Sequence, residues 1–253
     1  MKRPGAGWPQ LEPEAEGERD ACPFCAGHED RTPPETLTIG EPWRVRVVPN
    51  LYPAFQRQEV VVHAPEHVRT MAALDDEQLD LVAQAWQERA RAAPGYVHAI
   101  VNEGRAAGGS LPHSHSQLFW LPETPPEVER ERADALLLDG ERVEEQGGLV
   151  LVASPAPRVP YELRIVPVDR EADPWSSELL GPALRLLADG VRRLHRVCGG
   201  PVPLNVWLHH GTWWHLELFP RLTVLAGVEL GAGIYVVTVT PAEAARHLRE
   251  ASG

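Results

Sequence analysis

The stretch Leu111-Pro112-His113-Ser114-His115-Ser116-Gln117 carries the most specific pattern in the chain, and a loop rich in glycine, Gly104 to Ser110, precedes it. Two histidines separated by one residue, with alternation continuing to Leu121, predict a β-strand. On a strand, His113, His115 and Gln117 point to the same face, where three polar side chains make a poor core. The glycines let backbone N–H groups approach an anion closely. The pattern therefore predicts chemistry on a phosphate; the alternative is a pair of surface histidines on an edge strand.

The composition excludes several classes of function. The chain has 253 residues, a net charge of −12 and 43% hydrophobic residues. The negative charge argues against nucleic acid or an anionic membrane as a partner. No apolar run approaches the ~20 residues of a membrane span, and the start lacks the apolar region of a signal peptide, so we expect a cytoplasmic location. Because Lys2 is the only lysine, Schiff-base and P-loop chemistry are excluded, and cationic contacts to phosphate must come from arginine.

The cysteines indicate a metal or redox site near the N-terminus. Cys22 and Cys25 form a Cys-x-x-Cys pair, which outside a secreted context is typical of metal binding or redox chemistry. Cys198 follows an expected helix and is interpreted as inert.

The order of expected elements repeats. The first half predicts strands over 43–48 and 59–63, a helix from Asp75 to Pro94, and strands over 97–102 and through the histidines. A charged helix from Pro125 to about residue 138 connects the halves. The second half repeats this order about 102 residues later, so that His113 corresponds to His215 and His115 to Glu217.

We therefore expect an α+β fold of two repeats, with antiparallel sheets flanked by helices. The expected organisation is a poorly ordered segment over 1–21, a half over 22–140 that carries the active site, and a half over 141–253 that lacks the nucleophile.

Three motifs carry a resemblance to a known family. They are the His-x-His-x-Gln stretch, Cys22-Pro-Phe-Cys-Ala-Gly followed by Thr32-Pro-Pro-Glu, and Glu229-Leu-Gly-Ala-Gly-Ile234 followed by Thr240-Pro-Ala-Glu-Ala244. Together they resemble the galactose-1-phosphate uridylyltransferase family of the histidine triad superfamily, over the chain from Lys2 to its end. The resemblance implies two histidine-triad-like repeats.

The resemblance also assigns roles to the residues of the site. It implies that His115 is the nucleophile that carries the nucleotidyl group and that Gln117 orients its phosphate. Asn102, Gly108 and Ser110 become further substrate contacts, although Asn102 and Ser110 can equally be ordinary loop-capping residues.

Two metal sites follow from the same resemblance. It implies a structural zinc ion held by Cys22, Cys25, His67 and His113, of which the sequence pattern alone supports only the cysteine pair. A second metal site, found in some members of the family, would use Glu131, His209 or His210, and His215, with Glu217 in place of the last histidine.

The expected activity is that of a nucleotidyltransferase that moves a nucleoside monophosphate between a nucleotide sugar and a sugar 1-phosphate. The expected assembly is a homodimer. An alternative in the same fold is a nucleotide-sugar phosphorylase such as ADP-glucose phosphorylase. A third alternative is a degenerate nucleotide-binding module, favoured by the absence of the arginines that the family usually carries before Arg3-Pro4 but opposed by the intact His115-Ser-Gln117.

Overall fold

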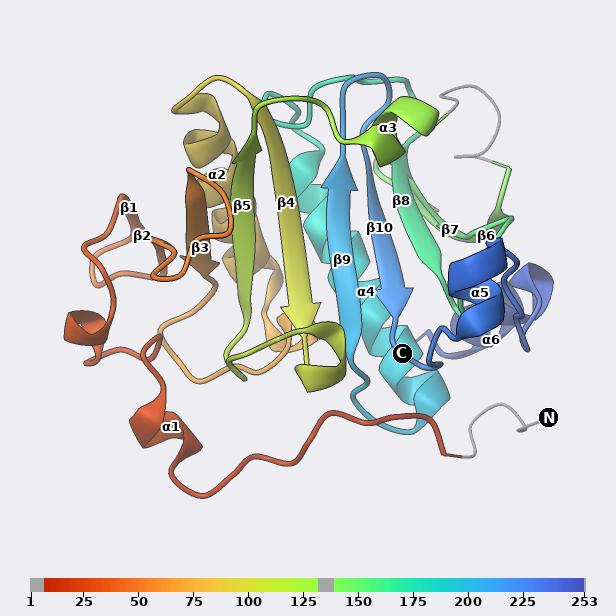
Figure 1. Ribbon diagram of the computed structural model, residues 1–253, viewed down its shortest axis with the longest axis horizontal. Coiled ribbons are helices and arrows are strands. Elements are labelled where there is room, and N and C mark those ends of the chain that lie inside the picture. The colour runs from red at the N-terminus through yellow and green to blue at the C-terminus, as the bar shows by residue number, and fades with distance from the viewer. Residues whose placement is uncertain (1–6, 132–138, 253) are drawn as a thin grey trace.

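The strands pair into one antiparallel sheet (Figure 1). The computed structural model describes residues 7–131 and 139–252. In the described residues the ten-stranded sheet has the order β1-β2-β3-β5-β4-β9-β10-β8-β7-β6. The strands are β1 Leu37–Ile39, β2 Val45–Pro49, β3 Gln58–Val62, β4 Tyr96–Glu103, β5 His115–Leu121, β6 Glu141–Gln146, β7 Leu149–Ala153, β8 Leu163–Pro167, β9 Leu204–His209 and β10 His215–Pro220.

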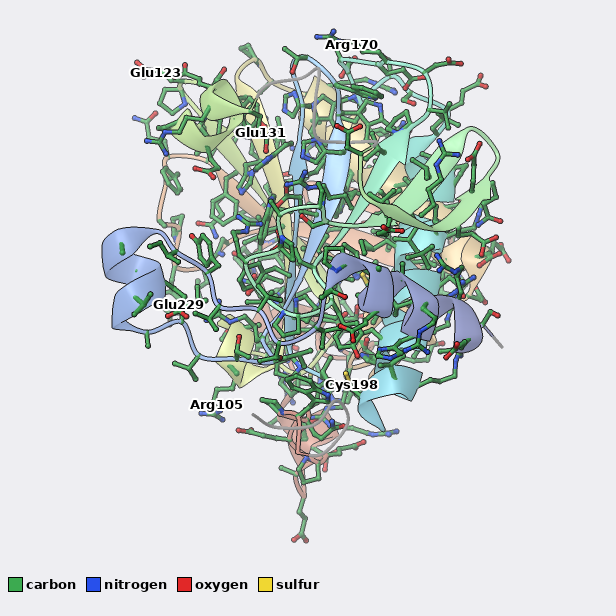
Figure 2. The ribbon with its side chains drawn as sticks, turned by 90° about the vertical axis from the view of Figure 1, so that its right-hand side faces the viewer. Arg105, Glu123, Glu131, Arg170, Cys198 and Glu229 are labelled. Carbon is green, nitrogen blue, oxygen red and sulfur yellow. The ribbon has the colours of Figure 1, made fainter. Side chains whose placement is uncertain are left out.

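The helices gather mainly on one face of this sheet. The α-helices are α1 Glu18–Ala21, α2 Asp76–Arg91, α3 Pro126–Arg130, α4 Leu180–Cys198, α5 Gly227–Ala232 and α6 Pro241–Glu250. The 3-10 helices are η1 Glu29–Arg31, η2 Met71–Ala73 and η3 Arg105–Ala107. Figure 1 shows α2 and α4 behind the central strands, and Figure 2 shows α5, with Glu229, standing out on the opposite side. We call the face of the sheet turned away from α2 and α4 the open face.

The expected α+β fold with its internal repeat is confirmed. Counted outward from the centre of the sheet, strands β4, β5, β3 and β2 of the first half have the same relative order as β9, β10, β8 and β7 of the second. The antiparallel sheets that the sequence predicts merge into one, because β4 and β9 pair with Asn102 opposite Asn205. This pairing covers two strand edges that would otherwise expose unpaired backbone groups. The division into the segments 1–21, 22–140 and 141–253 remains a prediction.

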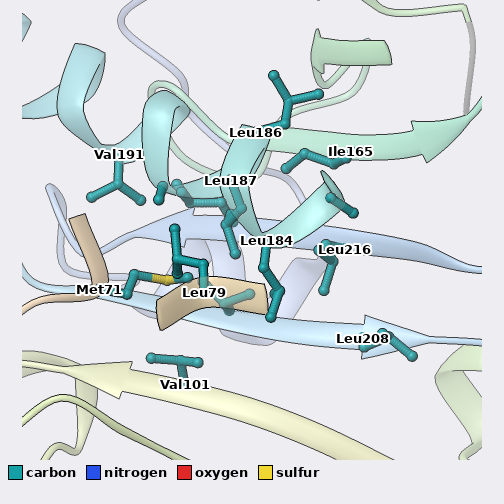
Figure 3. Close-up of a cluster of buried hydrophobic side chains, with 14 of the residues drawn as sticks. Met71, Leu79, Val101, Ile165, Leu184, Leu186, Leu187, Val191, Leu208 and Leu216 are labelled. Carbon is teal, nitrogen blue, oxygen red and sulfur yellow. The ribbon is translucent and has the colours of Figure 1, made fainter. Parts of the chain in front are cut away.

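The core lies between the sheet and the two long helices (Figure 3). Leu184 and Leu187 of α4 and Leu79 of α2 pack against strand residues such as Val101 and Leu216, and all five are buried. Asp75 caps α2 by accepting a hydrogen bond from the Gln78 N–H at 2.8 Å, which agrees with the helix start expected at this residue. The positive φ of 76° at Gly199 ends α4.

Two local expectations differ from the structure. His113 precedes β5 rather than lying in it, because the N–H of Ser114 leaves the strand ladder to donate to the carbonyl of Val68 at 2.5 Å. The charged connector helix ends at Arg130, since Glu131 takes extended backbone angles. Its short helix has no buried residue, so no packing against the core favours its extension. The remainder of the expected helix, residues 132–138, lies outside the described residues.

The N-terminal segment crosses one end of the sheet in extended form before α1. Figure 1 shows it running from the end of α4 past β9 and β4. The Leu11 N–H donates to the Pro201 carbonyl at 2.8 Å, and a Cβ added at Gly104 would lie 2.5 Å from the side chain of Leu11. The segment therefore reaches from the second half of the chain to the glycine loop. Within the described residues, no helix combines the length and apolar content needed to cross a membrane.

Candidate active site and metal centres

Two thiols and two imidazoles converge where the sequence predicts a metal site. The ligand atoms of Cys22, Cys25, His67 and His113 all lie within 4.8 Å of one another. The Nδ1 atom of His67 is 3.2 Å from the Cys25 Sγ, and the Nδ1 atom of His113 is 3.4 Å from the Cys22 Sγ. Burial is the main cause that raises the pKa of the Cys25 thiol to about 12, and the neighbouring Cys22 adds to it. A bound cation would reverse this shift by stabilising the thiolates, so the donor set fits a tetrahedral zinc ion.

A buried arginine holds in place the loop from Cys22 to Cys25, which we call the cysteine knuckle. Arg46 of β2 is fully buried, and its guanidinium donates to the Pro23 carbonyl at 2.9 Å and to the Thr32 hydroxyl and the Glu35 carboxylate at 3.0 Å each. These contacts connect the Cys-Pro-Phe-Cys motif with the Thr-Pro-Pro-Glu motif. Both motifs therefore stabilise one structure, the loop that carries two of the candidate metal ligands.

His115 is presented as a neutral imidazole with one nitrogen left for chemistry. Its Nδ1–H donates to the carbonyl of His113 at 2.7 Å, so the lone pair lies on Nε2. Only 6% of His115 is exposed, and burial lowers its pKa. A neutral imidazole of this tautomer is the form needed for nucleophilic attack.

Ser114 and Ser116, which alternate with His113, His115 and Gln117, form hydrogen bonds on the other face of the strand. His63 lies between the Ser114 and Ser116 hydroxyls, 2.9 Å from each, and the Trp86 indole N–H donates to Ser116 at 2.7 Å. Burial, with the nearby His115 and His113, lowers the pKa of His63 well below its ordinary value. A neutral, hydrogen-bonded His63 fixes the backbone on which His115 is carried. Sequence reasoning missed this contact, although the alternation of serine with histidine was its signal.

Two amides next to His115 are held by their oxygens. The Gln117 Oε1 accepts a hydrogen bond from the Gln58 amide at 2.6 Å, and the Asn102 Oδ1 accepts one from Asn205 at 2.7 Å. An amide held through its carbonyl keeps its NH2 group for a further acceptor, such as a phosphate oxygen. Asn102 owes its orientation to the second half of the chain.

Two cavities meet at Ser110, Leu111 and His115, which line both. One, of about 370 Å³, lies between the cysteine knuckle and the loop after β2, and Gln117 lines it. Its apolar lining includes Phe24, Val48, Leu51, Tyr52, Val60 and Leu111. The other, of about 150 Å³, lies between the glycine loop and the N-terminal segment.

The expected substrate contacts Asn102 and Ser110 line the smaller cavity, with Gly109 and His115. Gly108 is not among the residues that line either cavity; its φ of 81° ends η3 instead. At Gly109 an added Cβ would lie 2.8 Å from the Asn102 carbonyl oxygen, so this glycine permits the close turn of the loop.

The buried Glu103 and the partly buried Glu18 are two carboxylates of the smaller cavity that sequence reasoning missed. Glu103 accepts hydrogen bonds from the Met71 N–H at 2.6 Å and the Thr70 hydroxyl at 2.7 Å, and burial raises its pKa to about 7. Its inward position in the alternation of β4 was the one available signal. Glu18, before the cysteine pair, contacts His67.

The second half brings together another group of possible ligands. Donor atoms of Glu131, His209, His215 and Glu217 all lie within 4.8 Å of one another, and Figure 2 shows Glu131 next to α3. Burial alone would lower the pKa of His215, but the carboxylates of Glu131 and Glu217 outweigh it and raise it to about 9. This group selects His209 from the expected pair, because His210 stacks on Tyr96 with ring centroids 4.0 Å apart.

Two arginines form ion pairs with Glu217 of this second group. The Arg158 guanidinium lies 2.7 Å from the Glu217 carboxylate, and Arg164 lies 3.1 Å from it. The position that corresponds to His115 in the repeat is thus a carboxylate engaged by two cations, which leaves the second half without a nucleophilic imidazole at that position.

Comparisons with known proteins agree with this arrangement. A model described as the N-terminal domain of galactose-1-phosphate uridyl transferase matches residues 52–125. The chain is 26% identical to ADP-glucose phosphorylase of Arabidopsis thaliana over 92% of this chain and 82% of the relative. It is 23% identical to galactose-1-phosphate uridylyltransferase of Thermotoga maritima over 90% of this chain and 89% of the relative. The crystal structure of an ADP-glucose phosphorylase from Arabidopsis thaliana with bound ADP-glucose superposes with a TM-score of 0.82 and 24% identity, covering 91% of this chain and 90% of that chain. That structure therefore shares the fold.

Proposed function

Since this chain is related in sequence and fold to the galactose-1-phosphate uridylyltransferase family, we propose that it is a nucleotidyltransferase acting on nucleotide sugars. It moves a nucleoside monophosphate between a nucleotide sugar and a sugar 1-phosphate through a covalent intermediate on His115. The observation that carries this proposal is the hydrogen bond from His115 Nδ1–H to the His113 carbonyl, which leaves Nε2 as the nucleophile at the junction of two cavities.

The chemistry divides into two displacements. In the first, the His115 Nε2 lone pair attacks the α-phosphorus, the phosphoanhydride bond breaks, and the sugar 1-phosphate leaves with the bond electrons. In the second, a phosphate oxygen of the acceptor attacks the same phosphorus and the P–N bond breaks, which restores neutral His115. The NH2 group of Gln117 orients the α-phosphate, and Asn102 and Ser110 bind neighbouring oxygens from the smaller cavity. The apolar cavity beside Phe24 takes the nucleoside.

Inorganic phosphate as acceptor is the second candidate activity. The similarity to ADP-glucose phosphorylase over 92% of this chain favours it, because the same intermediate attacked by inorganic phosphate releases a nucleoside diphosphate. Only the acceptor differs between the two activities.

The metal and the assembly complete the proposal. A zinc ion held by Cys22, Cys25, His67 and His113 is structural, since its four protein ligands leave no open position. It supports the site by fixing His113, whose carbonyl orients His115. A homodimer is supported by the exposed apolar side chains around α5: Val224, Val228, Leu230, Ile234 and Val236.

A panel of nucleotide sugars tests the proposal. Each member is incubated with the protein alone, with a sugar 1-phosphate and with inorganic phosphate, and the release of sugar 1-phosphate is measured. Turnover that requires an acceptor supports the proposed transfer, and the acceptor identifies the activity. Binding of nucleotide sugars without turnover on any acceptor would support a degenerate binding module instead.

A further inference from the structure

A carboxylate from the N-terminal segment reaches one of the candidate metal ligands. Glu18, the first residue of α1, is 2.9 Å from the Nε2 of His67, and its side chain is only 11% exposed. The other nitrogen of the same ring, Nδ1, faces the Cys25 thiol at 3.2 Å. Glu18 and the metal position therefore lie on opposite sides of one imidazole.

The two histidines of the metal centre differ in what holds them. His113 donates its Nε2–H to the backbone carbonyl of Ala64 at 3.0 Å, which keeps Nδ1 for the metal. His67 has the same tautomer, but its Nε2–H donates to the Glu18 carboxylate instead. A carboxylate acceptor makes the imidazole a stronger ligand than a carbonyl acceptor does, because its charge stabilises the ring when electron density moves to the metal.

Glu18 is itself held in place. The Arg69 Nε lies 2.9 Å from the same carboxylate oxygen, Oε1, that accepts from His67. The other oxygen accepts from the Ala15 N–H at 3.1 Å. A carboxylate with both oxygens engaged has a fixed direction, as a residue that orients a metal ligand requires.

We propose that Glu18 is a positioning residue of the metal centre, which fixes the tautomer and direction of His67 and raises metal affinity. This inference rests on the proposed zinc site. Since Glu18 lies four positions before Cys22, the short stretch from Glu18 to Cys22 supplies both a metal ligand and the support of another ligand. The segment between Leu11 and Cys22 is thus part of the metal centre.

The test is the zinc affinity of full-length variants. Metal-free protein is titrated with zinc in competition with a chromophoric chelator, and circular dichroism of the metal-free forms checks folding. We expect Glu18→Gln to weaken zinc binding by about 10- to 100-fold, the usual effect of removing such a partner. Glu18→Ala should weaken it further, because the alanine provides no acceptor. Glu16→Gln is the matched control, since it removes the same charge from an exposed position of the same segment and should leave affinity unchanged.

Two further readouts separate positioning from a general structural role. Arg69→Gln leaves the His67–Glu18 contact in place and should weaken zinc binding less than Glu18→Ala. With cobalt(II) in place of zinc, Glu18→Ala should alter the visible absorption bands, which report ligand geometry. Both Glu18 variants could instead show unchanged zinc affinity and unchanged cobalt bands, with only a lower unfolding temperature of the metal-free form. This result would overturn the role of Glu18 but leave the proposed zinc site intact. A wild-type protein that binds no zinc would overturn the zinc site as well.

Discussion

Replacing Glu103 by glutamine should change how stability depends on pH. Glu103 is 3% exposed, and both carboxylate oxygens accept hydrogen bonds, from the Met71 N–H and from the Thr70 hydroxyl. A glutamine can keep its carbonyl on the Met71 N–H and donate its NH2 group to the Thr70 oxygen, which also accepts hydrogen bonds. The substitution therefore removes the ionisable proton while preserving both contacts.

The magnitude follows from the pKa. Burial raises the pKa of Glu103 from 4.5 to about 7, and at about 1.4 kcal/mol per unit this shift corresponds to about 3 kcal/mol. The folded-state pKa of this acid lies above the unfolded value, so the folded protein binds more protons over this range. The stabilising contribution is therefore complete below about pH 4.5 and is lost as the pH rises through 7.

Urea unfolding of the wild type and of Glu103→Gln at intervals from pH 4 to 8 measures the effect. We expect the free energy of unfolding of the variant, relative to that of the wild type, to increase by about 3 kcal/mol from pH 4 to pH 8. Comparing the two proteins at each pH cancels the titration of the histidines, and Glu123→Gln, at an exposed position, controls for the loss of a charge. A constant difference between the variant and the wild type from pH 4 to 8 would show that the reasoning is wrong.

Three other predictions concern the site. A donor labelled at its α-phosphate should leave label on the wild type that survives alkali and is lost in acid, as a phosphoramidate is, and His115→Ala should abolish it; sequential kinetics without label would contradict a covalent intermediate. Metal analysis should find about one zinc per chain, and Cys22→Ser should lose zinc and thermal stability together; full stability with no zinc in the wild type would refute the structural site. Glu217→Gln should leave the rate of the chemical step, measured in a single turnover, largely intact. A loss as large as that of His115→Ala would mean that the halves are assigned wrongly.

The sequence predicted what local patterns encode. The alternation from His115 to Leu121 and the helix start at Asp75 each depend on neighbours in the chain, and both are found where they were expected. The order of elements in the two halves was visible for the same reason. The connector helix ends earlier than expected, at Arg130, because it has no buried face to support it.

Contacts between distant segments were the part that the sequence could not give. His67 was placed at the metal site only by a family resemblance, because no spacing relates it to Cys25, 42 residues away. Glu18 was missed because its partner His67 lies 49 residues away along the chain. Glu103 was missed because its partners Thr70 and Met71 lie 33 and 32 residues away. The pairing of β4 with β9 had no signal, because either half could have kept its own sheet.

The pairing of β4 with β9 has a consequence for how such a chain can diversify. It is arranged like the contact between two subunits of a symmetric dimer, with Asn102 facing Asn205 across the centre, yet both sides belong to one polypeptide. Two identical subunits must share every substitution, so each would retain a nucleophile or lose it together. Within a single chain the two sides are free to diverge. One half has kept an imidazole at His115, while the other has a carboxylate at Glu217 and contributes the asparagine that orients its neighbour.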